Sequence, residues 1–183
     1  MEHFKHDTYI VLELPIKIHE QVMSIKMTFN DPIEMVTPAA DITVAGSSGV
    51  GLLNPAQEPH AVYSILDNIA LKIKPIKTSF LEVTRFPSTN IFFFSFEDET
   101  PFHDLHRKIA DSNIRFFKSE FPFKPHVTLC TSSSITEAEV KKLLAIKLDE
   151  EFMIDTLSVC SLEVSNNKMK DHLLYKVKLN GFL

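Results

Sequence analysis

The chain has 183 residues, 44% of them hydrophobic and 23% charged, which is the composition of a globular protein of one domain or of two small lobes sharing a core. Its net charge of −5 argues against broad binding to duplex DNA, and two cysteines provide neither a disulfide framework nor metal-ligand spacing. No apolar run approaches membrane-spanning length and the N-terminus is too polar to begin a signal peptide, so we expect a cytoplasmic protein that does not associate with membranes.

The first half of the chain predicts alternating strands and helices. The segments are strands at 8–14, 40–45, 79–85 and 90–96 and helices at 16–29 and 59–73. Asn30-Asp31-Pro32 ends the first helix, and the turn-forming residues from Phe86 to Thr89 predict a hairpin. Residues 46–51 hold three of the four glycines but lack a P-loop ending, so we treat them as a flexible loop rather than a phosphate cradle.

The second half predicts a similar order of elements. Thr100 and Pro101 are expected as the N-cap and first residue of a helix that runs to about Ser112. The later segments are the strand that carries His126, a helix from the capping box of Thr136 and Glu139 to about Ala145, strands at 151–164 and 172–179, and a polar turn at 165–170. Because this half repeats most of the first, we expect one bilobal domain over residues 1–183.

The stretch Phe121–Cys130 (FPFKPHVTLC) carries the clearest chemical signal. Strand alternation places His126 and Thr128 on one face, with Val127 and Leu129 on the other. An imidazole can carry a proton near neutral pH, and a hydroxyl can donate to an anionic oxygen. The pair suits phosphate chemistry, although a His-x-Thr tripeptide is a weak signal alone.

A repeat of this kind requires a counterpart of the His126 strand in the first half. That counterpart is PAADITV at 38–44, set against FKPHVTL at 123–129. Thr43 then lies opposite Thr128, and Asp41 lies opposite His126. The alignment therefore predicts two related motifs, one of which lacks its histidine.

Basic and aromatic residues interleave ahead of His126. They are Arg107, Lys108, Arg115, Lys118 and Lys124, with Phe116, Phe117, Phe121 and Phe123. Such a pattern can form a stacking platform for bases. The favoured interpretation is that the phenylalanines belong to the core and the cations to a solvated rim.

On these residues the chain resembles the two-histidine (2H) phosphoesterase superfamily, the 2′-5′ RNA ligase-like proteins. The resemblance rests on the opening strand Tyr9–Pro15 (YIVLELP), the FKPHVTL motif, the capped helix after it and the closing strand pair. It implies an α+β fold of two pseudo-symmetric α/β lobes whose antiparallel sheets flank a central groove. It further implies that each lobe supplies one His-x-Thr/Ser motif and that the pair acts on 2′,3′-cyclic phosphates or 2′-5′ phosphodiesters without a metal.

The chain departs from this family pattern in three places. The first motif matches in Ile42, Thr43 and Val44 but has Asp41 in place of histidine, and its Pro38 lies two positions out of register. The arginine that often follows the second motif in bacterial members is replaced by the run Thr131-Ser-Ser-Ser.

Three interpretations of Asp41 remain open. Ring opening of a cyclic phosphate needs a base and an acid, and Asp41 could act as base while His126 acts as acid. Alternatively, Asp41 marks a degenerate lobe in a binding protein, or another histidine, His6 or His60, completes the site. His103 and His106 lie one helical turn apart, a spacing that can chelate a metal, but no third ligand is evident nearby.

We therefore predict a protein that binds, and hydrolyses if Asp41 permits, a phosphodiester at a nucleotide or RNA end. The expected catalytic residues are His126, Thr128, Thr43 and Asp41, and the expected substrate-binding residues are Lys124, Phe123 and Arg115. We expect a monomer with no metal or other cofactor and no duplex DNA partner. The alternative is a non-catalytic interaction or regulatory module with no ligand in the groove, and a groove filled by phenylalanines would favour it.

Overall fold

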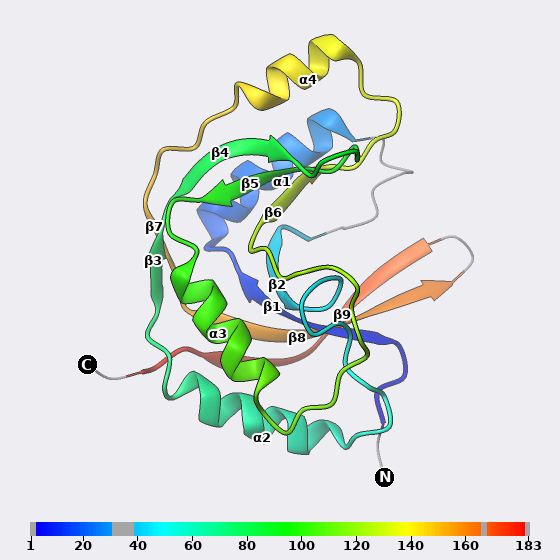
Figure 1. The fold of residues 1–183 in the computed structure, drawn as a ribbon, viewed down its shortest axis with the longest axis vertical. Coiled ribbons are helices and arrows are strands. Elements are labelled where there is room, and N and C mark those ends of the chain that lie inside the picture. The colour runs from blue at the N-terminus through cyan, green and yellow to red at the C-terminus, as the bar shows by residue number, and fades with distance from the viewer. Residues whose placement is uncertain (1–2, 31–38, 166–167, 182–183) are drawn as a thin grey trace.

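The computed structural model describes residues 3–30, 39–165 and 168–181 (Figure 1). Within these ranges the helices are α1 (Ile16–Phe29), α2 (Pro59–Ala70), α3 (Thr100–Ala110) and α4 (Glu137–Leu144). The strands are β1 (Asp7–Glu13), β2 (Asp41–Ala45), β3 (Ile76–Thr78), β4 (Phe80–Arg85), β5 (Phe92–Phe96), β6 (Val127–Cys130), β7 (Phe152–Ile154), β8 (Thr156–Ser165) and β9 (Lys168–Lys178). None of the described helices has the length and apolar composition that crossing a membrane requires.

The strands form antiparallel sheets, which confirms the predicted α+β fold class. One sheet has the order β2-β1-β8-β9, a second the order β4-β5-β6, and β3 pairs with β7. The first sheet thus joins strands from both ends of the chain. The predicted pseudo-repeat of the two halves stays a prediction.

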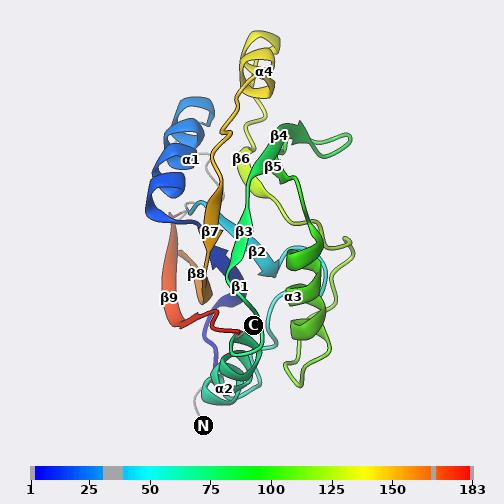
Figure 2. The ribbon, with the colours of Figure 1, turned by 90° about the vertical axis from the view of Figure 1, so that its left-hand side faces the viewer.

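Helices cover the sheets on both sides of the molecule. In Figure 2, α1 and α3 lie on opposite sides, with strands between them. Helix α2 contacts β9 and α3 contacts β2, whereas α1 contacts β6 and α4 contacts β4. The helix α1 therefore follows β1 in sequence but packs against a strand of the second half.

Several predicted elements agree closely with the structure. The first helix has the predicted bounds, and β4 and β5 form the predicted antiparallel hairpin. The capping box is present: the Glu139 amide donates to Thr136 Oγ1 at 3.3 Å, and the Thr136 amide donates to Glu139 Oε2 at 2.9 Å. Local sequence signals were sufficient at these places because each contact lies within a few residues.

Two predicted ends were wrong. Thr100 is the first residue of α3, not its N-cap, and its amide donates to the Asp98 side chain at 2.9 Å. Helix α2 ends at Ala70 instead of residue 73, and the Ala70 carbonyl accepts from the Ile73 amide at 3.3 Å and from the Asn180 amide at 3.0 Å. A residue of the closing segment thus takes up a carbonyl at the end of the helix.

The predicted strand at 151–164 is two strands, β7 and β8, which belong to different sheets. They separate at Asp155, whose Oδ1 accepts from Thr156 Oγ1 and Lys178 Nζ, each at 2.7 Å. Strand β3, which pairs with β7, was not predicted, and β9 begins at Lys168 inside the predicted turn. Asp31, Pro32, Pro38, Asn166 and Asn167 lie outside the described residues.

Candidate functional site

The two motifs lie on strands that contact each other, β2 and β6 (Figure 1). In β2, Ile42 and Val44 are buried, and the alternate residues Asp41 and Thr43 are partly exposed. The same alternation holds at β6, where Val127 and Leu129 are buried and Thr128 is partly exposed. It extends to His126, which directly precedes the strand and is also partly exposed. Each strand thus presents two polar side chains on the face opposite its apolar ones.

His126 is held in one orientation and one tautomer. Its Nδ1 lies 2.7 Å from the Lys124 carbonyl, which can only accept, so Nδ1 carries the hydrogen. The rings of Phe86 and Phe93 meet the imidazole edge to face, with centroids 5.1 and 5.2 Å away. Burial lowers the pKa of His126, against the effect of the Lys124 carbonyl. At neutral pH, Nε2 therefore holds a lone pair that can accept a proton.

The residues expected to bind substrate make contacts within the protein. Phe123 stacks on His106, with centroids 4.0 Å apart and planes 5° from parallel. The Lys124 ammonium is ion-paired with Glu99. The Arg115 guanidinium donates to the Ala56 carbonyl, just before α2.

Asp41 lies among charged groups from three other elements. Burial, helped by the Asp171 and Glu13 carboxylates, raises the pKa of Asp41 to about 7, although the nearby Lys26 charge opposes this rise. Lys26 is only 1% exposed, and its Nζ donates to the Ala39 carbonyl at 2.6 Å. Burial lowers the pKa of Lys26 to about 8, although the negative charges of Asp41 and Asp171 act to raise it. Asp41 can therefore hold a proton near neutral pH, as a histidine would.

Tyr9 and Cys160 complete this polar cluster. The Tyr9 hydroxyl donates to Asp171, and burial together with that carboxylate raises the pKa of Tyr9. Burial and the charges of Asp41 and Asp171 raise the pKa of the Cys160 thiol to about 12. The thiol is protonated at neutral pH and is no nucleophile.

Helix α1 connects the two motif strands. Its Lys26 lies beside Asp41. Asn30, the residue after the end of the helix, makes hydrogen bonds to β6 and to the residue that follows it, Thr131. The Asn30 Nδ2 donates to the Leu129 carbonyl at 2.7 Å, and its Oδ1 accepts from the Thr131 amide at 2.9 Å. The position of Lys26 is thereby linked to the position of the His126 strand.

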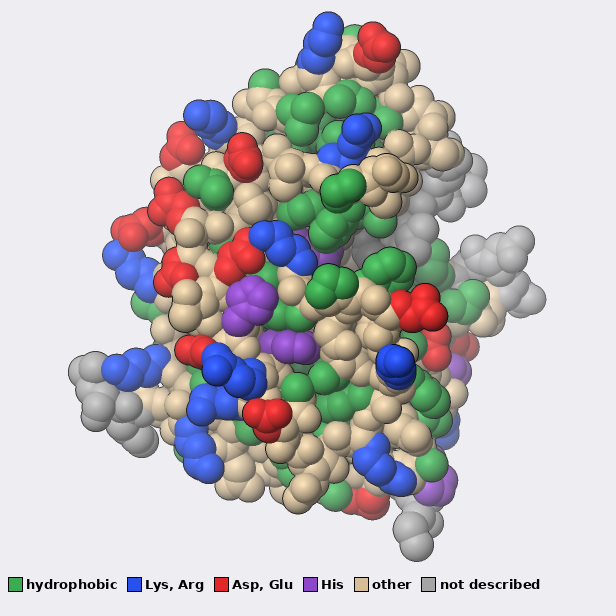
Figure 3. All heavy atoms as spheres, in the orientation of Figure 1, with side chains coloured by type: hydrophobic (Ala, Val, Ile, Leu, Met, Phe, Trp, Pro, Cys, Tyr) green, Lys and Arg blue, Asp and Glu red, His purple; other side chains and the backbone are tan. Residues whose placement is uncertain are grey.

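His106, on α3, makes a second connection. Its Nδ1 donates to the Val44 carbonyl of β2 at 2.7 Å while its ring covers Phe123. Burial lowers the pKa of His106, although the Val44 hydrogen bond opposes the shift. Figure 3 shows histidine side chains grouped near the middle of this face.

The glycine-rich loop at 46–51 is tied to the segment that approaches β6. The Gly49 amide donates to the Phe121 carbonyl at 2.8 Å, and Ser119 Oγ donates to the Ser47 carbonyl at 3.2 Å. Gly49 has φ of +69°, and a Cβ there would lie 2.2 Å from Cε1 of His106. The loop is thus a packed connection between the two motifs.

The other candidate histidines, His6 and His60, lie away from the two motifs. His6 and His60 line a hollow that contains none of the four expected catalytic residues. Among the described residues, no group of three or more His, Cys, Asp or Glu side chains could hold a metal ion.

The interleaved basic and aromatic residues separate into different environments. Phe116 and Phe123 are partly buried, whereas Phe117 and Phe121 are 50% and 68% exposed. Lys108 lines a hollow of about 340 Å³ with Lys72, Lys74 and Lys77. Figure 3 shows Lys and Arg side chains gathered over α3 and the end of α2.

The positive charge of this lysine hollow is largely uncompensated. Its one lining carboxylate, Asp104, is ion-paired with Arg107, and Lys77 pairs with Glu151 at 2.9 Å. Lys72, Lys74 and Lys108 make no ion pair with any residue that the structure describes. The hollow can therefore attract an anion in a protein of negative net charge.

Sequence reasoning missed Lys26 and the contacts of His106 with Val44 and Phe123. Lys26 continues the buried stripe of Ile18 and Val22 at four-residue spacing, and this spacing was the available signal. His106 lies one residue from Leu105 and three from Ile109, both buried, so its place at the edge of the apolar face could have been inferred.

Comparisons with known proteins agree on the family and the fold. Residues 50–166 match the model of the 2′-5′ RNA ligase superfamily, a span that includes His126 and Thr128 but not β2. No curated protein matches the sequence closely enough to count as a relative.

Solved structures from Thermus thermophilus and E. coli have a similar fold. TT0787 of Thermus thermophilus superposes with a TM-score of 0.69 at 15% identity, covering 96% of this chain and 98% of its own. LigT of E. coli complexed with 3′-AMP superposes with a TM-score of 0.64 at 14% identity, covering 95% of this chain and 98% of LigT. LigT complexed with phosphate superposes with a TM-score of 0.64 at 12% identity, covering 98% of this chain and 99% of LigT. These likenesses concern the fold.

Proposed function

This chain belongs to the 2′-5′ RNA ligase superfamily, and we propose that it hydrolyses a 2′,3′-cyclic phosphate or a 2′-5′ phosphodiester at a nucleotide or RNA end. His126 acts as the base and Asp41 as the acid in this proposal. Similarity to LigT, which was solved with 3′-AMP and with phosphate, supports a nucleotide ligand.

The proposal rests on the opposite directions of the pKa shifts of Asp41 and His126. Burial raises the pKa of Asp41 to about 7 and lowers the pKa of His126. A neutral imidazole and a protonated carboxyl can then coexist near neutral pH. Divergent shifts of this kind assign the acid and the base. The roles are therefore the reverse of those expected from the ordinary pKa of an aspartate.

The proposed reaction uses one water molecule and returns both groups to their starting states. Nε2 of His126 takes a proton from water as its oxygen bonds to phosphorus. Asp41 gives its proton to the ribose oxygen as the bond between that oxygen and phosphorus breaks. The hydroxyls of Thr43 and Thr128 donate to the non-bridging oxygens, where charge builds up. Proton exchange with solvent then restores neutral His126 and protonated Asp41.

We assign Phe123, Lys124 and Arg115 to the surroundings of the substrate rather than to the reaction. Phe123 offers a ring, held in place by His106, against which a base can pack. The Lys124 ammonium lies two residues before His126 in the chain and is shared with Glu99. The lysine hollow offers a further attraction for the phosphates of a longer strand.

The test is hydrolysis of a panel of 2′,3′-cyclic nucleotides and 2′-5′ dinucleotides by wild type, His126→Ala, Asp41→Asn and Asp41→His. We expect wild-type turnover that falls by about 10²-fold or more in His126→Ala and Asp41→Asn, the typical size of a general acid or base effect. Asp41→His should keep activity, because an imidazolium can also donate the proton. Equal turnover by wild type and His126→Ala would refute the proposal.

A specific observation favours a non-catalytic alternative. The carboxylates of Glu13 and Asp171 lie close enough to raise the pKa of Asp41, and an ionised Asp41 would add a further negative charge that repels a phosphate. In this alternative the protein has lost hydrolytic activity and acts as an interaction or regulatory module. If wild type is inactive and Asp41→His gains activity, the site is a degenerate one that still binds a nucleotide. Absence of both activity and nucleotide binding in every variant would select the interaction module.

A further inference from the structure

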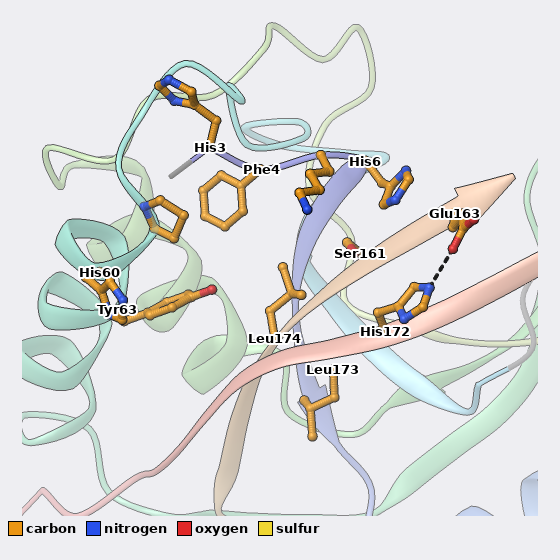
Figure 4. A pocket seen from close by; sticks show the side chains of 12 residues that line it. His3, Phe4, His6, His60, Tyr63, Ser161, Glu163, His172, Leu173 and Leu174 are labelled. Carbon is orange, nitrogen blue, oxygen red and sulfur yellow. Dashed lines mark hydrogen bonds and ion pairs between the residues drawn. The ribbon is translucent and has the colours of Figure 1, made fainter. Parts of the chain in front are cut away.

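A hollow of about 870 Å³ lies between the N-terminal segment, α2 and the paired strands β8 and β9 (Figure 4). Its volume is in the range of small-molecule sites. Figure 4 shows Phe4 and Tyr63 on one side of it and His6 and His172 on the other. Neither the proposed function nor the family match accounts for this grouping.

The hollow and the candidate active site lie on opposite faces of one sheet. In β9, Asp171 accepts from Tyr9 and influences Asp41, so its side chain is on the Asp41 face. The next residue, His172, points to the other face, where it is ion-paired with Glu163. A ligand in the hollow is therefore separated from Asp41 by the sheet itself.

The apolar side of the hollow is a set of packed rings. Tyr63 stacks on Tyr175 with centroids 4.4 Å apart and planes 8° from parallel, and the Tyr175 hydroxyl donates to Asp67. Phe4, only 6% exposed, meets Tyr63 edge to face at 6.4 Å. Leu174 lines the same hollow and is 39% exposed. Rings held in this way suit a flat, apolar ligand group.

The polar part of the lining holds Lys5, His6 and His172 with a single carboxylate, Glu163. Lys5 lines the hollow and makes no ion pair with any described residue. The one lining carboxylate, Glu163, is already occupied by His172 at 2.9 Å. The His6 ring lies nearly parallel to the His172 ring, with centroids 6.3 Å apart and planes 15° from parallel. An anionic group of a ligand would find donors here and little repulsion.

We propose that this hollow is a second ligand site, which binds a nucleoside phosphate. The base packs against Tyr63 and Leu174, and the phosphate lies near Lys5 and His6. Base stacking on aromatic side chains contributes about 1–3 kcal/mol. The proposal does not depend on hydrolysis at Asp41 and His126.

The test is a titration of the ¹⁵N-labelled protein with 5′-AMP, adenosine and inorganic phosphate at neutral pH. We expect 5′-AMP to shift the amides of residues 3–6, 60–63 and 172–174. Lys5→Ala and His6→Ala should each raise Kd about tenfold, the loss of one charge-assisted contact. Lys17→Ala, which removes an exposed lysine outside the hollow, is the matched control and should leave Kd unchanged.

Two outcomes would overturn the proposal. One is the absence of shifts at these amides with millimolar 5′-AMP, and the other is an unchanged Kd in both Lys5→Ala and His6→Ala. Adenosine that binds as tightly as 5′-AMP would also refute recognition of the phosphate. Hexa-adenylate distinguishes the source of the ligand: tighter binding than 5′-AMP identifies an RNA segment, and equal or weaker binding identifies a free nucleotide.

Discussion

His106 lies flat against Phe123 while its Nδ1 donates to the carbonyl of Val44. One side chain of α3 thus joins the end of the Asp41 strand to the approach of the His126 strand. Gly49 lies so close to this imidazole that any side chain there would displace it. The relative position of the two motifs therefore depends on a residue in each of three separate segments.

Gly49→Ala tests this connection. The new methyl group would meet Cε1 of His106, and alanine disfavours the left-handed conformation at φ of +69°. We expect the free energy of unfolding to fall by about 1–3 kcal/mol. Urea denaturation measures it, with Ser47→Ala as the control in the same loop. An unchanged midpoint in Gly49→Ala would show that His106 is not held as described.

The pH dependence of the proposed reaction should be bell-shaped and centred on the acid side of neutrality. His126 must be neutral, and burial lowers its pKa, so the acidic limb lies below the usual imidazole range. Asp41 must be protonated, so kcat/KM should fall as the pH rises through the Asp41 pKa of about 7. Steady-state rates with 2′,3′-cyclic AMP between pH 4 and 10 give both limbs. A rate that keeps rising above pH 8 would exclude Asp41 as the acid.

Lys26→Met should move the basic limb of that profile. The positive charge of Lys26 opposes the rise in the Asp41 pKa, so its removal lets that pKa rise further and shifts the limb to higher pH. Methionine has a similar length and suits a buried position. Lys17→Met, at an exposed position of the same helix, is the control. If both variants gave the wild-type profile, Lys26 would have no influence on the proton of Asp41.

Stability should depend on pH through Asp41 as well. Its pKa in the folded protein, about 7, is above the ordinary carboxyl value, so its proton stabilises the fold. This contribution is fully present below about pH 4 and is lost as the pH rises through about 7. Asp41→Asn cannot ionise, so its melting temperature relative to wild type should increase between pH 5 and pH 8. A constant difference between the two proteins would contradict a buried, protonated Asp41.

The lysine hollow predicts salt-dependent binding of single-stranded RNA. Replacing Lys72, Lys74 and Lys108 together by glutamine should weaken binding of hexa-adenylate and make the plot of log K against log salt less steep. Each lost phosphate contact contributes about 0.7 to the slope for a single strand. The matched control replaces Lys141, Lys142 and Lys147, in and after α4. Equal slopes in the two triple variants would rule out a specific role for the hollow.

Local patterns predicted much of the fold, and long-range pairing accounts for what they missed. The bounds of α1 and the two faces of β2 and β6 follow from spacings of a few residues. The division at Asp155 could not be predicted, because an apolar stretch of the length of 151–164 is compatible with one strand or two. Which of the two occurs depends on partners in β1, β3 and β9.

For the candidate site too, the sequence predicted which residues belong together but not how distant residues change their chemistry. Alignment of the two halves identified His126, Thr128, Thr43 and Asp41 as a group, and that grouping is still a prediction. The prediction of Asp41 as the base assumed an ordinary carboxyl pKa, and the raised pKa favours the opposite role that we propose. The raised pKa comes from burial and from Asp171, a residue far away in sequence that reaches Asp41 only through the pairing of β8 with β1 and β9.

The strand order β2-β1-β8-β9 has a consequence for how the protein is made. The two N-terminal strands leave the ribosome long before residues 156–178 exist, so β1 has an unpaired edge throughout most of synthesis. A sheet closed by such distant segments also forms slowly, because a long loop must be ordered before the contacts form. The nascent chain should therefore depend on chaperones until its last strands arrive, and a ribosome stalled before residue 156 should hold a chain that proteases readily cut.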